Sequence, residues 1–303
     1  MTSTDNIPMV GSAMTVSSRP CDRLNISGRL LRIARPRSET YEPLEDPERC
    51  LSEIRESGLR ADLFSFAQRF SQPAPIYSYH CELEPTAILQ IETYDKWWKQ
   101  TINDKTRNMV RKAGKKGVRI ELANYTDDFV RGIKQVYDEC PIRQGKKSRH
   151  YGKSFEVIKS EHGTFLEQSE FIGAYVDQRM IGFAKVVFRK DFASIMNLIA
   201  LLGERDKAPT NALLAKVVER CAARGIGLLH YGVWSRRGFG DFKEHHGFEC
   251  RQIPRYYVPL TRRGALALRR GWHRPVGDRV PEKVADWFAT MRTRWYAWRY
   301  PMK

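Results

Sequence analysis

Three neighbouring strand-like segments near the middle of the chain constrain its fold more than any other feature. They are rich in branched and aromatic residues, and they span Phe171 to Val176, Met180 to Phe188 and Phe192 to Leu202. Only three residues separate each segment from the next, Asp177-Gln178-Arg179 and Arg189-Lys190-Asp191. Connections this short join antiparallel neighbours, because a parallel pair needs a crossover of a dozen or more residues. The sequence therefore predicts a three-stranded antiparallel meander.

Helices and strands surround this meander in a regular order. A helix is predicted directly after it, over 209–224, because apolar residues recur at helical spacing before Gly225. A buried strand (226–234), a short helix (239–245) and a last strand (248–260) follow. Upstream, the sequence predicts strands at 75–81, 86–92 and 118–122, and helices at 105–116, from 127 to a stop at Pro141, and at 155–165. This order predicts a mixed α/β (α+β) fold with a mainly antiparallel sheet flanked by helices.

The two ends of the chain differ from this central part, so we predict three regions. Residues 1–74 are an N-terminal arm with a strand within 29–35 and short helices, one capped by Asp46 and one over 61–70. Residues 75–260 are the main domain. Residues 261–303 are a basic, aromatic, helical tail in which Trp and other apolar residues recur on one helical face from 281 onward. Such a face suits either packing on the domain or a peripheral contact with an anionic membrane.

Charge is the strongest signal in the composition. The chain has 52 Lys and Arg against 35 Asp and Glu, a formal net charge of +17. Most of the excess lies in two segments, 96–119 with nine basic residues against one acidic, and 262–303 with eleven against three. This clustering favours anionic partners, among them nucleic acid, CoA phosphates and lipid headgroups, although a solvated helix surface accounts for it equally well.

Several classes of protein are excluded by what the sequence lacks. It has six cysteines without a Cys-x-x-Cys pair, and no Walker-type loop, Gly-x-Ser-x-Gly or His-Glu-x-x-His motif. The adjacent His245 and His246 would point about 100° apart on a helix, so no metal site is expected. No apolar stretch approaches the roughly 18 residues of a membrane-spanning helix, and the N-terminus lacks the pattern of a secretory signal. The sequence therefore predicts a cytoplasmic protein, with peripheral association at the inner face of the membrane as a secondary expectation.

The order of elements and three local patterns resemble the GNAT acyltransferase superfamily. The patterns are FIGAYVDQRMIGFAKVVF, then LLAKVVERCAARGIGLLHYGV, then FKEHHGFE before the last strand. A narrower resemblance, to FemAB-like proteins and to acetyltransferase-type relatives of polysaccharide gene clusters, depends on the residues Lys105, Arg107, Asn108, Arg111, Lys112, Ala113, Gly117 and Val118. The resemblance covers about residues 75–260.

This resemblance implies where a site would lie. Binding of acyl-CoA as co-substrate is expected around the meander's end and the following helix, at Leu201, Leu202, Arg205, Lys207, Thr210 and Asn211. Acid–base chemistry is expected from Glu204, Tyr231, Asp241 and Lys243, with His230 as a further candidate. The basic helix and the cationic loop 141–153 would bind substrate through Arg107, Arg111, Lys112, Arg143, Gln144 and Tyr151. Two departures from the family pattern are a single glycine, Gly203, in the pyrophosphate loop and Lys243 where many members have the general-acid tyrosine.

The resemblance implies an N-acyltransferase that moves an acyl group from acyl-CoA or a carrier-bound donor to an amine, in cell-envelope or polysaccharide biosynthesis. Two alternatives stay open. One is a FemAB-like aminoacyl-tRNA-dependent transferase, for which the basic helix would neutralise RNA phosphates. The other is a non-catalytic GNAT fold that binds nucleic acid or acts as a scaffold.

Overall fold

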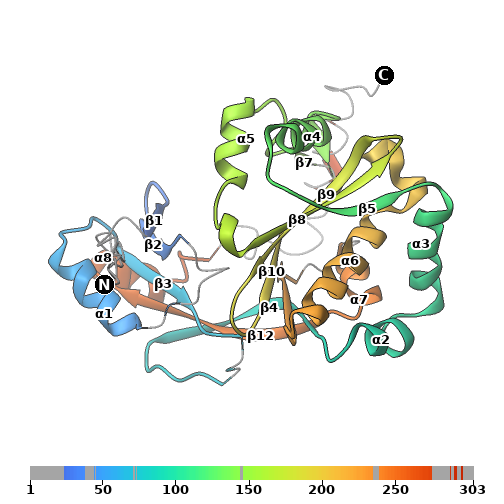
Figure 1. Cartoon of the computed structure of the whole chain (residues 1–303). Coiled ribbons are helices and arrows are strands. Elements are labelled where there is room, and N and C mark those ends of the chain that lie inside the picture. Colours follow the sequence, from blue (N-terminus) through green and yellow to red (C-terminus); the bar gives the residue numbers. More distant parts are fainter. Residues whose placement is uncertain are drawn as a thin grey trace, which may run out of the picture.

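One ten-stranded sheet runs through the computed structural model, in the order β1-β2-β3-β12-β4-β11-β10-β9-β8-β5 (Figure 1). The structure describes residues 24–37, 44, 46–70, 72, 74–143, 146–234, 239–274, 287, 290, 291 and 295. The strands of the sheet are β1 (Leu24–Ser27), β2 (Ile33–Pro36), β3 (Leu63–Ala67), β4 (His80–Gln90), β5 (Arg119–Ala123), β8 (Ser169–Val176), β9 (Arg179–Phe188), β10 (Ala193–Ala200), β11 (Leu228–Val233) and β12 (Glu249–Pro259). A separate pair, β6 (Ile142–Arg143) and β7 (Lys146–Lys147), lies in the predicted cationic loop.

The helices pack around this sheet. They are α1 (Pro47–Glu56), α2 (Tyr94–Lys96), the π-helical turn η2 (Trp97–Thr101), α3 (Asp104–Lys115), α4 (Asp127–Tyr137), α5 (Phe155–His162), the 3₁₀ turns η3 (Leu166–Gln168) and η4 (Leu202–Lys207), α6 (Pro209–Ala223), α7 (Phe239–His245) and α8 (Arg262–Arg269). In Figure 1, α1 and α8 lie beside β1–β3 at one end of the sheet, and α3, α6 and α7 lie together at the other. Each end has its own cluster of buried apolar side chains.

The predicted meander is confirmed, with a tighter first turn than expected. Val176 of β8 pairs directly with Arg179 of β9, so only Asp177 and Gln178 form the turn. Both have positive φ, 48° and 65°, which is the backbone conformation of the two-residue turn that best matches the twist of a hairpin. The predicted helices at 105–116 and 209–224 are also present, as α3 and α6, and Asp46 caps α1 as expected.

Two predictions about the N-terminal half are wrong. The helix expected over 61–70 is instead the strand β3, which pairs with β12 from Leu63↔Pro259 to Arg255↔Ala67. The strands expected at 75–81 and 86–92 are replaced by one strand, β4, which runs through Pro85. A proline is accepted there because it lies at the end of the β4–β11 pairing, after Val233↔Thr86, where its oxygen still accepts the N–H of Trp234 (2.8 Å) and only the N–H is lost.

The sheet continues across the boundary predicted at residue 74, since β1, β2 and β3 extend it beyond β12. The division into three regions stays a prediction. No helix among the described residues is long and apolar enough to span a membrane. Of the predicted C-terminal helix, only Trp287, Thr290, Met291 and Trp295 are described, all four in helical conformation, and the remainder lies outside the described residues.

Candidate functional site

The strands β10 and β11 are hydrogen-bonded to each other only at their first residues. Ala193 pairs with Leu229 and Ser194 with His230, in parallel register, and no later pair follows. A bulge at Ile195/Asn197 in β10 and an irregularity between His230 and Val233 in β11, where Gly232 has a φ of +66°, redirect the two strands. Beyond this point β10 and β11 are no longer paired with each other, and this is the region in which the family resemblance predicts the donor.

Lys243 is buried against the part of β11 that is no longer paired with β10. It lies on α7 and its side chain is 2% exposed. Its Nζ donates hydrogen bonds to the backbone oxygens of Tyr231 (2.6 Å) and Val233 (2.8 Å), and it lies 4.8 Å from the centre of the Tyr231 ring. Burial lowers the pKa of Lys243 to about 8 and raises that of Tyr231. At neutral pH this lysine is mostly charged, so it stabilises backbone carbonyls and is a poor general base.

His230 is buried directly behind the same point. Its Nδ1 lies 3.1 Å from the Ser194 hydroxyl, and its ring stacks on Phe70 with ring centres 4.5 Å apart. Burial, followed by the positive charge of Lys243, lowers the pKa of His230 to about 3. The imidazole is therefore neutral at physiological pH, and it ties the paired starts of the two strands together.

The loop from β10 to α6, where the sequence predicted CoA binding, already holds an anion supplied by the protein. The carboxylate of Glu139 accepts the backbone N–H groups of Leu202 (2.7 Å) and Gly203 (2.8 Å), while the N–H of Leu201 donates to Ile181 (2.8 Å). Arg143 donates to the Glu139 carboxylate (2.8 Å) and to the backbone oxygen of Ala200 (2.9 Å). Both amides lie where the resemblance predicts binding of the CoA ester, Gly203 in the pyrophosphate loop itself, and in this structure they bind a carboxylate.

Other residues predicted for cofactor binding take part in contacts between elements. Asn211 lies 3.2 Å from Nε2 of the buried His246, which joins α6 to the end of α7. Lys207 forms an ion pair with Glu204. Thr210 is half-buried in the first turn of α6, and Arg205 is exposed beside it. The predicted acid Asp241 is exposed on α7.

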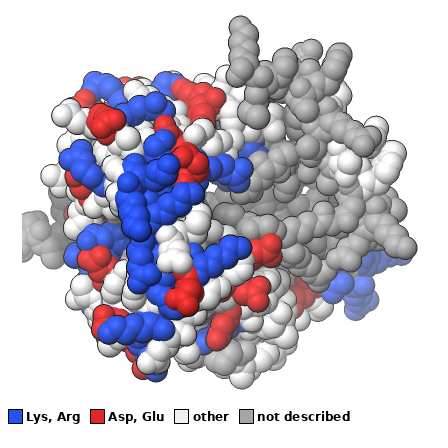
Figure 2. Space-filling view, turned by 90° about the vertical axis from the view of Figure 1, so that its right-hand side faces the viewer, with Lys and Arg blue, Asp and Glu red and all other residues white. Residues whose placement is uncertain are grey.

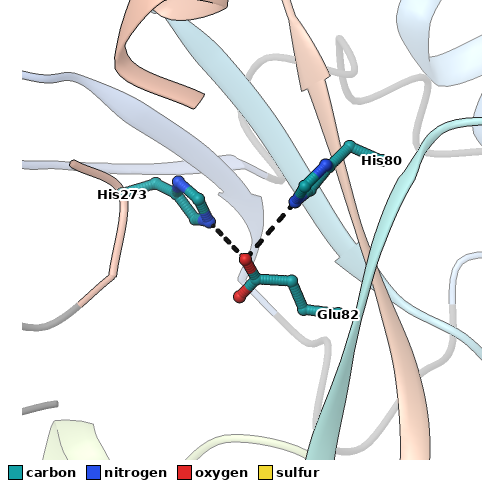
Figure 3. A group of neighbouring side chains, drawn as sticks. All are labelled: His80, Glu82 and His273. Atoms are coloured by element: carbon teal, nitrogen blue, oxygen red, sulfur yellow. Dashed lines mark hydrogen bonds and ion pairs between the residues drawn. The ribbon is translucent and has the colours of Figure 1, made fainter. Parts of the chain in front are cut away.

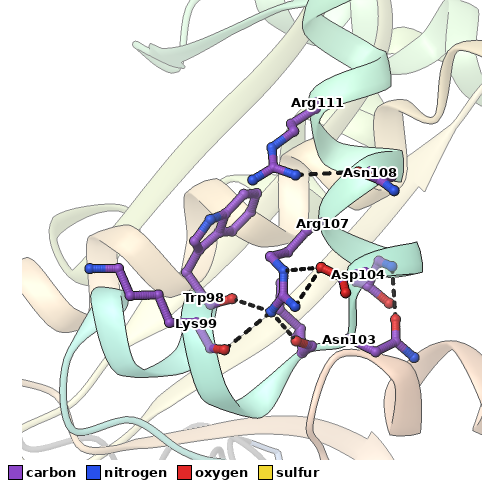
Figure 4. Close-up of polar contacts among 9 residues, drawn as sticks. Trp98, Lys99, Asn103, Asp104, Arg107, Asn108 and Arg111 are labelled. Carbon is purple, nitrogen blue, oxygen red and sulfur yellow. Dashed lines mark hydrogen bonds and ion pairs between the residues drawn. The ribbon is translucent and has the colours of Figure 1, made fainter.

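One arginine of the basic helix α3, Arg107, has a structural role. Arg107 has only 16% of its side chain exposed, and its guanidinium donates to the backbone oxygens of Trp98 (2.8 Å) and Ile102 and to the Asp104 carboxylate (2.8 Å) (Figure 4). It therefore satisfies carbonyls at the end of η2 and fixes η2 against α3. Sequence analysis predicted that Arg107 binds substrate, whereas in the structure its N–H groups donate to backbone oxygens and to Asp104.

The remaining cations of α3 face outward. Arg111 lies over the Trp98 ring, with its guanidinium carbon 5.6 Å from the ring centre, and donates to the Asn108 side-chain oxygen (3.2 Å) (Figure 4). Among the described residues no carboxylate forms an ion pair with Lys105, Arg111, Lys112, Lys115 or Lys116. At 100° per residue these five positions fall within about 140° of the helix circumference. Figure 2, which views this side of the molecule, shows Lys and Arg gathered in a band down the face.

The residues of loop 141–153 that were predicted to bind substrate do not lie together in one site. Arg143 belongs to the Glu139 contact, Tyr151 is 43% exposed, and Gln144 lies outside the described residues. Sequence analysis missed Glu139, whose only signal was a carboxylate shortly before Pro141. It also missed Trp98, because nothing in the sequence indicates that Arg111 of α3 would stack on this ring.

The sheet, the meander followed by α6 and the separating strands β10 and β11 define a protein with a GNAT-like fold. Solved structures share this fold at low sequence identity. The C-terminal domain of a putative lysylphosphatidylglycerol synthetase from Agrobacterium fabrum matches with a TM-score of 0.55 and 14% identity, covering 81% of this chain and 83% of that one. L-PGS from Bacillus licheniformis matches with a TM-score of 0.54 and 16% identity, over 78% and 81% of the two chains. FemX matches with a TM-score of 0.51 and 12% identity, over 75% and 72%.

These likenesses confirm, at the level of the fold, the resemblance to the GNAT superfamily and to FemAB-like proteins. No protein-family model matches the chain, and no curated protein matches it. The residues assigned to the site therefore stay predictions, to be weighed by their geometry.

Proposed function

We propose that the protein is a GNAT-fold transferase that moves an acyl or aminoacyl group from an RNA-borne donor to an amine. The observation that carries this proposal is the outward face of α3, with five cations that form no ion pair with the described carboxylates, one of which, Arg111, is stacked on Trp98. Lysines placed along a helix neutralise successive phosphates, and an aromatic side chain beside them is a surface on which bases stack.

The contact made by Glu139 disfavours ordinary CoA binding. A pyrophosphate placed at the N–H groups of Leu202 and Gly203 would have to displace this carboxylate or lie beside its negative charge. An RNA-borne donor has no pyrophosphate to place there, so it avoids this conflict.

The names of the structural neighbours support an aminoacyl donor and an acceptor from the cell envelope. A lysylphosphatidylglycerol synthetase is named for a product in which a lysyl group is attached to a lipid. In the present chain the ester of the donor would lie between the ends of β10 and β11, and the acceptor amine would approach from the loop 141–153.

The reaction would then depend on positioning. The neutral amine attacks the ester carbonyl, a C–N bond forms and the C–O bond to the donor breaks, and the proton of the amine passes to the departing ribose oxygen through solvent. The contribution of the protein is to bind both partners in a fixed geometry. Lys243 supports this geometry by holding the β11 backbone.

Salt-dependent RNA binding tests this proposal. The affinity for tRNA would be measured at several salt concentrations for the parent chain and for the variant K105Q/K115Q/K116Q, in which three exposed lysines of the α3 face are neutralised. We expect weaker binding and a salt slope reduced by about 2 to 3, since each phosphate contact contributes roughly 0.7–0.9. The matched control is R262Q/R263Q/R269Q, which removes three exposed cations of α8 and should leave the slope nearly unchanged.

A slope that changes only in the α8 variant, or an absence of tRNA binding, would contradict the proposal. Binding of RNA without transfer from aminoacyl-tRNA to any amine would instead favour the non-catalytic alternative.

Acyl-CoA remains the second candidate donor, favoured by Arg205, which is exposed at the loop before α6 where CoA phosphates would lie. If CoA binds there, E139Q should bind it more tightly than the parent chain, because the glutamine removes the negative charge and can accept only one of the two backbone N–H groups, which frees the other for a phosphate. A rise in melting temperature with acyl-CoA in both proteins, larger in E139Q, would support this candidate over the RNA-borne donor.

A further inference from the structure

We propose that His80, Glu82 and His273 form a binding site for a divalent first-row transition metal ion, with zinc as the representative ion. The site lies at the start of β4, apart from the region where the pairing of β10 with β11 ends. It is independent of the proposed transferase function.

Three ligand atoms converge there from two distant parts of the chain. Nε2 of His273 lies 2.7 Å and Nε2 of His80 lies 3.3 Å from the same oxygen, Oε1 of Glu82, and all three atoms lie within 4.8 Å of one another (Figure 3). Ligands bound to zinc at 2.0–2.1 Å in a tetrahedron are about 3.3 Å apart. Small side-chain movements are therefore sufficient to surround an ion.

The backbone explains why these groups face one another. His80 and Glu82 are two residues apart on β4, so their side chains point to the same face of the sheet, while Cys81 points to the other. His273 follows α8 and has only 1% of its side chain exposed, which holds its ring in place against Tyr257, with ring centres 4.5 Å apart. Sequence analysis weighed only the adjacent His245 and His246 for a metal and missed this group, because His273 is 191 residues from Glu82.

The donor set suits a transition metal better than calcium or magnesium. Two imidazoles and one carboxylate are the protein ligands of many three-ligand zinc sites, in which a fourth position is open to water or substrate. The His80 side chain is 43% exposed and that of Glu82 23%, so an ion can enter from solvent. Although burial raises the pKa of Glu82, hydrogen bonds from His273, Arg274 and His80 outweigh it and lower that pKa, so the carboxylate is ionised at neutral pH.

Arg274 competes for the same carboxylate. Its Nε donates to Oε1 of Glu82 at 2.9 Å, and its side chain is 55% exposed. A metal ion would displace this guanidinium into solvent. The competition makes a distinctive prediction, because removal of a positive charge from a metal site should strengthen metal binding.

The test uses the full chain without an affinity tag. Zinc binding is measured by titration calorimetry, and cobalt binding by absorption, which separates imidazole and carboxylate ligands from cysteine because thiolates add a charge-transfer band. We expect one ion per chain, no thiolate band, binding weakened at least tenfold in H80Q and strengthened severalfold in R274A. H245Q on α7 and R270A, whose guanidinium lies over the Trp272 ring, are the matched controls and should bind as the parent chain does.

His80 is exposed enough that H80Q should fold normally, so its loss of binding would report on the site. Absence of binding by the parent chain, equal binding by H80Q, or weaker binding by R274A would each overturn the proposal.

Discussion

At the scale of single residues, the buried polar side chains around the candidate site mainly form hydrogen bonds with backbone oxygens and N–H groups. Lys243 donates to two carbonyls of β11, Arg107 to carbonyls at the end of η2, and Glu139 accepts two N–H groups of the loop before α6. A sequence motif gives the type and spacing of such residues, but only the structure shows which groups their donors and acceptors bind. Lys243 is the clearest case, because it takes the position of a general acid in the family pattern and is enclosed by backbone.

Replacing Lys243 tests this structural role. We expect K243M to lower the free energy of unfolding by about 1–3 kcal/mol, since the methionine fills a similar volume and leaves the oxygens of Tyr231 and Val233 without this donor. Urea unfolding would measure the change. K216M, which removes a partly exposed lysine of α6 paired with Glu219, is the control and should change stability by less than about 0.5 kcal/mol. Unchanged stability in K243M would show that the lysine is not needed for the fold.

At the scale of elements, two helices that flank the candidate site end on glycines with similar backbones and different surroundings. Gly225 follows α6 with a φ of +67°, and Gly247 follows α7 with a φ of +83°. A Cβ at Gly225 would meet no atom within 4 Å, whereas one at Gly247 would lie 2.2 Å from Cγ2 of Thr101. The end of α7 is therefore packed against η2, in agreement with the hydrogen bond from the Trp97 indole to the backbone of His246 (2.9 Å).

Alanine substitutions at these two glycines therefore measure two different costs, backbone strain alone at Gly225 and backbone strain plus a steric clash at Gly247. G225A should cost about 1 kcal/mol, the cost of a left-handed conformation for a residue with a side chain. G247A should cost at least 1–2 kcal/mol more, because Thr101 must also move. Thermal or urea unfolding of both variants measures the difference, and the added change T101S, which removes the opposing methyl group, should reduce the cost of G247A toward that of G225A. Equal costs for the two glycine variants would rule out tight packing of α7 on η2.

At the scale of the whole molecule, one sheet joins two apolar cores and buries several histidines in neutral form. Burial is the largest cause that lowers the pKa of His162 to about 4, of His230 to about 3 and of His246 to about 4. In the unfolded chain these groups titrate near 6.5, so between that pH and about 4 the unfolded state binds more protons than the folded state.

The contribution of these neutral histidines to the free energy of unfolding should therefore be fully present above about pH 6.5 and be lost as the pH falls toward 4. The expected slope is on the order of 1 kcal/mol per pH unit for each of these histidines. Urea unfolding at several pH values from 7.5 to about 4.5 gives this slope. H246N should reduce the slope by the contribution of one histidine, about 1 kcal/mol per pH unit. H245Q, which changes an exposed histidine, should leave the slope unchanged. An unchanged slope in H246N would show that His246 does not contribute to the pH dependence.

The sequence alone determined the parts of this protein whose signals are local. The meander, α3, α4 and α6 follow from periodicity, caps and turn residues within a few positions, and so does the GNAT-like order that the solved structures share. Each of these elements satisfies its own backbone or pairs with a close neighbour, so its pattern can be read without knowledge of the rest of the chain.

The tertiary structure decided what depends on distant partners. The segment 61–70 has apolar residues compatible with a helix or a strand, and its pairing with β12, nearly 200 residues later, made it β3. Glu139 meets the loop at Leu202 across 63 positions, and His273 meets Glu82 across 191. Hydrogen bonds, burial and charge act over a few ångströms in space, whatever the separation along the chain, so the contacts that form the candidate sites appear only once the chain is folded.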